Sequence, residues 1–76
     1  MSTIDIEMQF NLRLASKIKQ ARLEADLSQI ELARLLETNQ QNISAYETGR
    51  WQPGPYTISL LCKATGKPAD YFINGD

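Results

Sequence analysis

A capping box near the middle of the chain fixes the start of a helix more firmly than any other feature of this sequence. Ser28 is followed three residues later by Glu31, and in that pattern each side chain can bind a free backbone N–H of the other residue. We therefore expect a helix to begin at about Gln29. The apolar residues that continue it at helical spacing are Leu32, Ala33 and Leu36.

A second short helix is expected after a tight turn at residues 37–39, because Asn39 is a good cap for a helix that starts at Gln40. At about 100° per residue, one side of this helix carries Ile43, Tyr46 and Glu47. The other side carries Gln40, Gln41, Ser44 and Ala45. One face can therefore pack against the protein, while the other offers amides, a hydroxyl and a methyl group.

The size and composition of the chain restrict its function. A chain of 76 residues makes one small domain, and because such a chain buries only about 60% of its unfolded surface, we expect no deep catalytic cleft. The single cysteine, Cys62, cannot form an internal disulfide and is expected to be a small buried hydrophobe. The sequence has no His, no metal-ligand cluster and no glycine-rich phosphate loop, so we expect neither an enzyme nor a metal or cofactor site.

Targeting features and charge give further limits. No apolar run approaches the roughly 20 residues of a membrane span, and the first ten residues carry acids where a signal peptide needs basic and then apolar residues. We therefore expect a cytoplasmic protein without a membrane partner. The formal net charge of −1 counts against nucleic-acid binding, because neutralising phosphates requires Lys and Arg.

Residues 1–10 show no helical period and no cap, so we interpret them as an N-terminal tail or arm ahead of a domain at residues 11–76. The apolar residues of this segment alternate with polar ones, which is the period of a strand. They are Ile4, Ile6, Met8 and Phe10. Two alternatives stay open: a disordered or loosely docked arm, and a strand or arm that packs on a partner subunit.

Three further helices complete the predicted fold. Asn11 can cap a first helix at residues 12–25, which Asp26 ends because aspartate tolerates a left-handed turn. Its core stripe is Leu14, Ile18, Ala21 and Ala25.

The C-terminal part of the chain follows the same logic. Pro55 suits the first position of a helix at residues 55–65, and Gly66 is a natural stop. A last short turn at residues 69–73 brings Phe72 to the core. The expected fold is all-α, with five short helices around one core.

From about residue 14 to residue 73 the chain resembles the helix-turn-helix domain of the lambdoid phage repressor and Cro group, also called the XRE type. The matching elements are Ile18 with Arg22, the LSQIELA run at residues 27–33, Ile43-Ser44, Glu47, Gly49, Pro53 and the closing ADYFI. The resemblance implies a compact, lambda-repressor-like DNA-binding domain. It also implies a sequence-specific transcriptional regulator, with repression as the expected activity.

In that family the second helix of the motif lies in the major groove and reads base edges. Gln40, Gln41 and Ala45 match its base-contacting positions, and Ser44 lies on the same face. The chemistry agrees, because a Gln amide can exchange paired hydrogen bonds with adenine, and an alanine methyl can pack on a thymine methyl. The alternative is a polar surface with no partner.

Phosphate contacts are expected to hold this helix in register. Gln29 matches a family position whose side chain and backbone N–H contact a phosphate. Further candidates are Asn42, Thr48, Arg50 and Lys17. Arg22 and Glu47 match a family pair that forms a partly buried ion pair, and we assign both to structure because burial of either charge alone would be costly.

The chain departs from the family pattern at two turn positions. Asp26 and Glu37 stand where the family commonly has Gly, and a non-glycine residue at positive φ is strained.

The resemblance implies two partners. These are double-stranded DNA and a second copy of the chain, since family members pair on two half-sites about one turn apart. We assign the dimer surface to residues 71–76. The alternative function is a protein-interaction module of the same fold that has lost DNA binding. A toxin or antirepressor partner, and the roles of phage repressor, antitoxin and restriction–modification controller, all fit the sequence.

Overall fold

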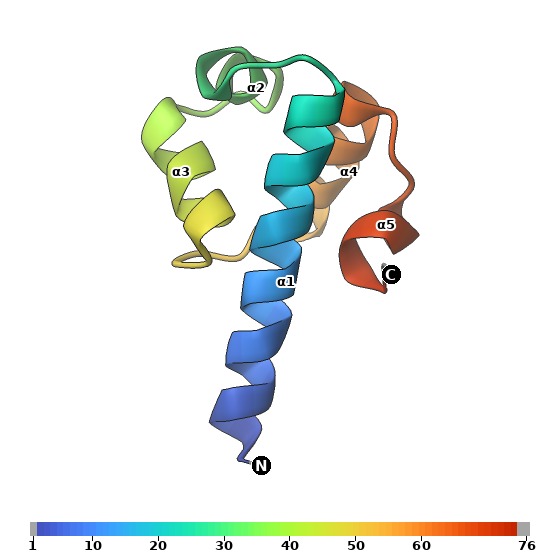
Figure 1. Cartoon of the computed structure of the whole chain (residues 1–76). Helices are drawn as coiled ribbons and strands as arrows, with labels where there is room; N and C mark the ends of the chain where they lie inside the picture. Colours follow the sequence, from blue (N-terminus) through green and yellow to red (C-terminus); the bar gives the residue numbers. More distant parts are fainter. Residues whose placement is uncertain (1, 75–76) are drawn as a thin grey trace.

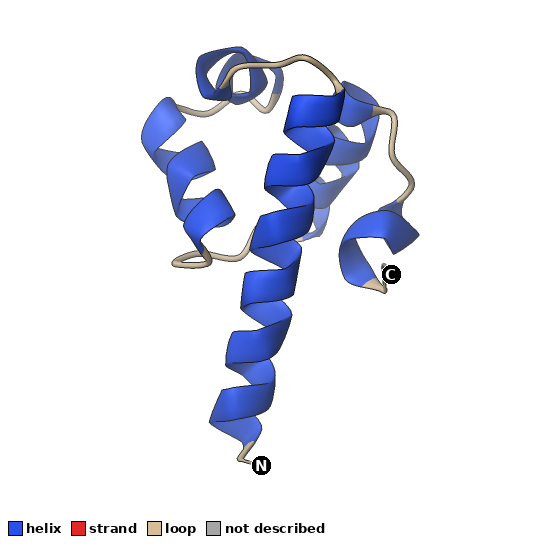
Figure 2. Ribbon diagram, viewed as in Figure 1, coloured by secondary structure: helices blue, strands red, loops and turns tan. Residues whose placement is uncertain are grey.

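The computed structural model describes residues 2–74, which contain five helices (Figure 1, Figure 2). In chain order these are α1 (Thr3–Glu24), α2 (Gln29–Leu35), α3 (Gln40–Thr48), α4 (Pro55–Thr65) and α5 (Ala69–Ile73). No strand occurs among the described residues, so the predicted all-α, five-helix class is confirmed. None of these helices is both long and apolar enough to cross a membrane.

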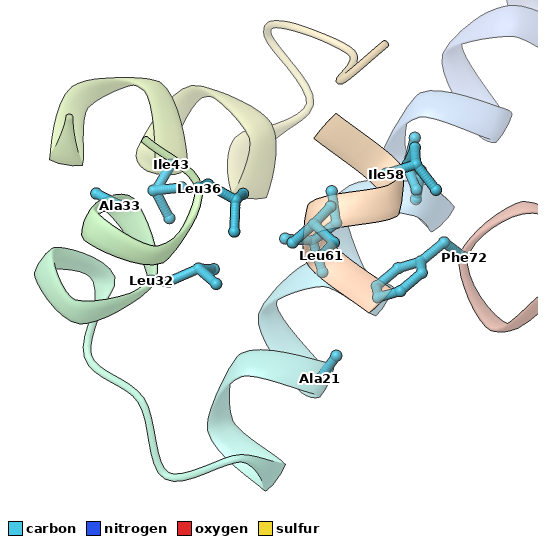
Figure 3. Close-up of a cluster of buried hydrophobic side chains, with 10 residues drawn as sticks. Ala21, Leu32, Ala33, Leu36, Ile43, Ile58, Leu61 and Phe72 are labelled. Atoms are coloured by element: carbon cyan, nitrogen blue, oxygen red, sulfur yellow. The ribbon is translucent and has the colours of Figure 1, made fainter. Parts of the chain in front are cut away.

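The core lies where the helices meet, and its largest fully buried side chains come from four of them. These are Ile18 of α1, Leu32 of α2, Ile43 of α3 and Leu61 of α4. The fifth helix contributes Phe72, which is 2% exposed and lies near Ile58 and Leu61 (Figure 3). A helix of five residues is too short to be stable alone, so α5 depends on its packing, to which the buried Phe72, predicted from the sequence, contributes.

α1 begins nine residues earlier than the sequence predicted. Its cap is Ser2, whose hydroxyl oxygen accepts a hydrogen bond from the backbone N–H of Asp5 at 3.2 Å. The predicted start at Leu12 with Asn11 as the cap is therefore wrong, because residues 3–10 are already helical.

The alternating apolar pattern of the N-terminal segment also suits a helix. Ile4 and Met8 are four residues apart, as are Ile6 and Phe10, and residues at this spacing lie on the same side of a helix. The strand and the disordered arm are therefore both incorrect for residues 3–10. Residue 1 of the predicted tail lies outside the described residues.

Residues 3–10, which we call the N-terminal extension, continue α1 beyond the body that the other helices form (Figure 1). Its apolar side chains are exposed: Ile4 by 70%, Ile6 by 56%, Met8 by 56% and Phe10 by 37%. Packing of this segment on a partner subunit stays a prediction.

The turns adopt the conformations that the sequence predicted. Asp26 and Glu37 have positive φ values of 58° and 59°, which is uncommon for residues other than glycine. The hydroxyl of Tyr56 donates a hydrogen bond of 3.0 Å to the carboxylate of Glu37 and so links α4 to that turn. Gly66 ends α4 at a φ of 76°, as expected.

Candidate nucleic-acid interface

α3 lies on the outside of the molecule, beside α1 and α2 (Figure 1). At its start the side chain of Asn39 accepts a hydrogen bond of 2.9 Å from the backbone N–H of Asn42. At its end Gly49 has a φ of 81°, and a Cβ atom there would lie 3.3 Å from Leu12 of α1. Both ends of the helix are therefore fixed, the second by a close approach to α1 that favours glycine.

The two faces of α3 differ as the sequence predicted. Ile43 is fully buried and belongs to the core, whereas Gln40 and Gln41 are exposed. Ser44 is half-buried between these two sides. An uncovered pair of amides is therefore available to a ligand that approaches the amino end of α3.

Ala45 requires a correction. It is only 1% exposed, so its methyl group cannot reach a thymine methyl in this conformation. The helical wheel of α3 did not predict this, because it considers one helix alone, whereas burial also depends on the packing of α3 against α1 and α2. The backbone N–H groups of Arg50 and Trp51 both donate to the carbonyl oxygen of Ala45, at 3.0 and 3.3 Å.

A buried ion pair joins α3 to α1. The guanidinium of Arg22 binds both carboxylate oxygens of Glu47, with Nε to Oε2 at 2.7 Å and Nη2 to Oε1 at 3.1 Å. Arg22 also donates to the carbonyl oxygen of Leu27 at 2.9 Å. The two charged side chains are 10% and 4% exposed, so each supplies the partner without which the other would be costly to bury.

Two glutamine side chains extend this ion pair to the outer face of α3. Nε2 of Gln29 donates to Oε1 of Glu47 at 3.1 Å, and Nε2 of Gln40 donates to Oε1 of Gln29 at 3.3 Å. A carboxylate can only accept, so Glu47 fixes the amide of Gln29 with its carbonyl oxygen toward Gln40. We call this connected set, Arg22, Glu47, Gln29 and Gln40, the amide relay.

The amide relay leaves Gln40 with the groups that it needs to read a base. One N–H of its amide is used by Gln29, while the other N–H and the carbonyl oxygen are not needed for that bond. Adenine presents one acceptor and one donor in the major groove. The remaining donor and acceptor of Gln40 match that pair, in an orientation set from within the protein.

The predicted phosphate contacts on α2, α3 and the loop after α3 fall into two groups. Gln29 and the exposed Arg50 lie at the two ends of the helix-turn-helix. Asn42 and Thr48 already make local bonds: the Asn42 amide donates to Thr38 at 2.6 Å, and the Thr48 hydroxyl donates to the carbonyl of Ser44 at 2.9 Å. A hydroxyl has a single proton, so Thr48 would have to break that bond to donate to a phosphate.

Lys17 also requires a correction. Its ammonium lies 4.7 Å from the ring centre of Tyr71, on α5, and α5 lies on the opposite side of α1 from α3 (Figure 1). It is therefore not part of the surface that Gln40 and Gln41 form. The spacing within α1 could not show this, because the position of α5 depends on the burial of Phe72.

The residues described by the structure contain no group of three or more His, Cys, Asp or Glu side chains placed to hold a metal ion. The surface around α3 offers amides, hydroxyls and one nearby guanidinium instead, which are groups that bind bases and phosphates.

Two short helices, α2 and α3, joined by the four residues 36–39, with the outer face of the second carrying ordered amides, define a helix-turn-helix DNA-binding domain. The helix-turn-helix family model matches residues 18–72, which is more than half of the chain. The chain therefore belongs to the XRE-type helix-turn-helix family, also described as Cro/C1-type. It is a DNA-binding regulator of that family.

Sequence reasoning did not find the bridging position of Gln29. The sequence marked this residue only as a phosphate contact at the start of α2, yet its side chain lies between Glu47 and Gln40. The available signal was that amides stand at the first position of both α2 and α3. Their proximity depends on the angle between the two helices, which a linear pattern does not contain.

Proposed function

We propose that this protein is a sequence-specific transcriptional repressor that reads the major groove with the outer face of α3. Gln40 and Gln41 contact base edges, and Ser44 reaches a base or a water molecule beside them. Gln29 and Arg50 contact phosphates on either side, with Asn42 and Thr48 as weaker contacts. A protein with this function works where the chromosome is, so we place it in the cytoplasm.

The amide relay carries this proposal. A surface amide without a function needs no fixed orientation, yet Gln40 is connected through Gln29 to a buried carboxylate. A side chain held in its binding orientation loses less conformational entropy on contact. The same connection explains how Arg22 and Glu47 support base reading while remaining structural residues.

The proposed form on DNA is a homodimer on an operator with two half-sites. One reading helix covers only about half a turn of duplex, and paired domains of this class bind half-sites about one turn apart. A second copy also doubles the contacts, which matters for a chain whose formal net charge is −1.

Selection of bound sites from a random pool of DNA duplexes tests the base contacts directly. We expect the Gln41→Ala variant to lose its preference at one base pair per half-site, at a cost of about 1–3 kcal/mol in discrimination. Gln9→Ala is the matched control, because Gln9 is an exposed amide on the N-terminal extension. Unchanged selection by Gln41→Ala would contradict the assignment of that residue.

The net charge of −1 supports one alternative, a protein-interaction module that uses this fold without DNA. A salt titration with random duplex DNA separates the two functions. A DNA-binding protein loses affinity as salt rises, because its contacts release counterions from the phosphates. An interaction module shows no DNA binding at any salt concentration, and that result would contradict the proposed function.

A further inference from the structure

An apolar groove opens at the base of the N-terminal extension, between α1, α4 and α5. It has a volume of about 640 Å³, and none of its lining residues comes from α2 or α3. The apolar side chains that line it include Phe10, Leu14, Pro53, Ile58, Cys62 and Ile73. The groove is therefore separate from the surface that we assign to DNA.

The exposed apolar side chains of the extension lead directly into this groove. Phe10 lines the groove, and Ile6 lies one helical turn before it on the same side of α1. Because α1 is one continuous helix with a rise of about 1.5 Å per residue, Ile6 stands about 6 Å beyond Phe10 along the axis. A continuous helix cannot fold back, so the part of the extension before Phe10 cannot enter the groove of its own chain.

We propose that a second copy of this chain occupies the groove, and that it does so with its own N-terminal extension. The arrangement is reciprocal, so each chain inserts Ile6 and its neighbours into the groove of the other around a twofold axis. An interface of this kind needs two complementary surfaces on the same chain. The extension and the groove are such a pair, and one symmetric contact covers both.

The charges of the two surfaces are complementary. The extension carries Asp5 and Glu7 and no Lys or Arg, while the charged side chain among those that line the groove is Lys63. An acidic helix inserted into this groove therefore meets a basic group at its edge. A small apolar ligand would fill the groove but leave Ile6 exposed, whereas the extension of a second copy buries its own Ile6 there.

The reciprocal contact buries more surface than the groove alone, because each chain contributes both its extension and its groove. Specific interfaces bury about 800 Å² on each partner, more than a groove of this size offers by itself. Two extensions and two grooves contribute together in the symmetric arrangement. Ile73 of α5 lines the groove, so the interface includes one residue of the segment 71–76 that the sequence suggested as the dimer surface, of which residues 75–76 lie outside the described residues.

This inference specifies the homodimer of the proposed function, but it does not depend on DNA reading. No residue of α3 lines the groove. A variant can therefore lose self-association and keep DNA binding, or the reverse.

Sedimentation of the full chain at several concentrations tests the interface. We expect a dimer for the wild type, and we expect Ile6→Lys to weaken self-association by about tenfold or more. Leu23→Lys is the matched control, because Leu23 lies on the same helix and is 55% exposed against 56% for Ile6. It should leave self-association unchanged within about twofold. A wild type that stays monomeric at about 1 mM, or a dimer that tolerates Ile6→Lys, would overturn the proposal.

Cross-linking locates the contact by using Cys62, the free cysteine that lines the groove. Under mild oxidation, Ile6→Cys should form a disulfide with Cys62 of the second copy. The product is a species of about 17 kDa, twice the 8.6 kDa of one chain. The double variant Ile6→Cys with Cys62→Ser should lose this product. If the double variant cross-links equally well, the two extensions contact each other instead, and the proposal is wrong.

A salt titration of Ile6→Lys with random duplex DNA keeps the two proposals distinguishable. Retained, salt-sensitive binding together with lost self-association supports the interface while leaving α3 in its assigned role. If the wild type forms the predicted dimer but binds no DNA, only the proposed function fails.

Discussion

The helix-turn-helix and the N-terminal extension differ in how their side chains are accommodated. In the helix-turn-helix, the charge of Glu47 is paired with Arg22, and Gln29 and Gln40 extend that pair to the surface. In the extension, large apolar side chains such as Ile4 and Ile6 stand in solvent. The polar side chains of the first region have their partners within a single chain, whereas the apolar side chains of the second remain exposed in a single chain.

This difference indicates where each region obtains its stability. α2 has seven residues and α3 has nine, lengths at which isolated helices are marginal in water, so caps, core contacts and the ion pair hold them in place. The extension is helical because it continues α1 and is capped by Ser2. A substitution that disturbs the helix-turn-helix should therefore lower the stability of the whole domain. A substitution that disturbs the extension should affect only the extension.

The largest expected effect is that of breaking the ion pair. Glu47→Ala leaves the guanidinium of Arg22 buried and without its carboxylate, and we expect it to lower the free energy of unfolding by about 3–5 kcal/mol. Urea unfolding followed by circular dichroism measures this loss.

The control for that prediction replaces both charges. The double variant Arg22→Met with Glu47→Leu should recover most of the stability, because a buried ion pair can be exchanged for apolar side chains of similar volume. If Glu47→Ala costs less than about 1 kcal/mol, the pair is effectively solvated, and the contrast between the two regions is weaker than we argue.

A smaller loss is expected at the capping box. Ser28→Ala removes the hydroxyl that accepts from the N–H of Glu31 at 3.0 Å, and we expect it to cost about 1 kcal/mol of global stability. Because α2 carries Leu32 into the core, the whole domain should lose stability together. Separate unfolding of α2, seen by hydrogen exchange at lower denaturant than the core, would argue against that coupling.

The elements that sequence reasoning predicted best have their signals within a few residues. The capping box at Ser28 and the glycine stop at Gly66 are confirmed, because a cap or a left-handed turn depends on local chemistry. The positive φ of Asp26 is confirmed for the same reason, whereas that of Glu37 was expected from the glycine that the family commonly has at this position.

The errors arose where neighbours in space decide the outcome. Ala45 is on the outer side of the α3 helical wheel, yet it is buried in the folded domain. The ammonium of Lys17 lies over the ring of Tyr71, which belongs to α5. The apolar groove beside Phe10 is formed by three helices, and no single stretch of the sequence contains it.

Acidification should weaken the helix-turn-helix through Glu31. The backbone N–H of Ser28 donates to this carboxylate at 2.8 Å and lowers the pKa of Glu31 below its usual 4.5. The resulting stabilisation is present above pH 4.5 and is lost as the pH falls through the lowered pKa, because the unfolded chain takes up the proton first.

Glu24 adds a contribution of the same sign. Lys67 donates to this carboxylate at 2.7 Å, and that hydrogen bond lowers the pKa of Glu24. Thermal midpoints measured from pH 7 to about pH 3 should fall less steeply in Glu31→Gln, and also in Lys67→Met, than in the wild type. Equal slopes in all three proteins would show that neither carboxylate contributes to acid sensitivity.

The smallest global effect is expected when the cap substitution is repeated in the extension. Ser2 caps α1 as Ser28 caps α2, and its oxygen accepts from the N–H of Asp5 at 3.2 Å. Ser2→Ala should change the free energy of global unfolding of the monomer by less than about 0.5 kcal/mol, because residues 3–10 can fray while the core stays intact.

Hydrogen exchange measured on dilute monomer should show faster exchange in residues 6–10 and unchanged protection at Ile18, which is fully buried. At concentrations that favour the dimer, the difference should become smaller, because docking on a second copy holds the extension helical whether or not its cap is present. A global loss as large as that of Ser28→Ala would mean that the extension and the helix-turn-helix unfold as one unit, and the distinction between the two regions would no longer hold.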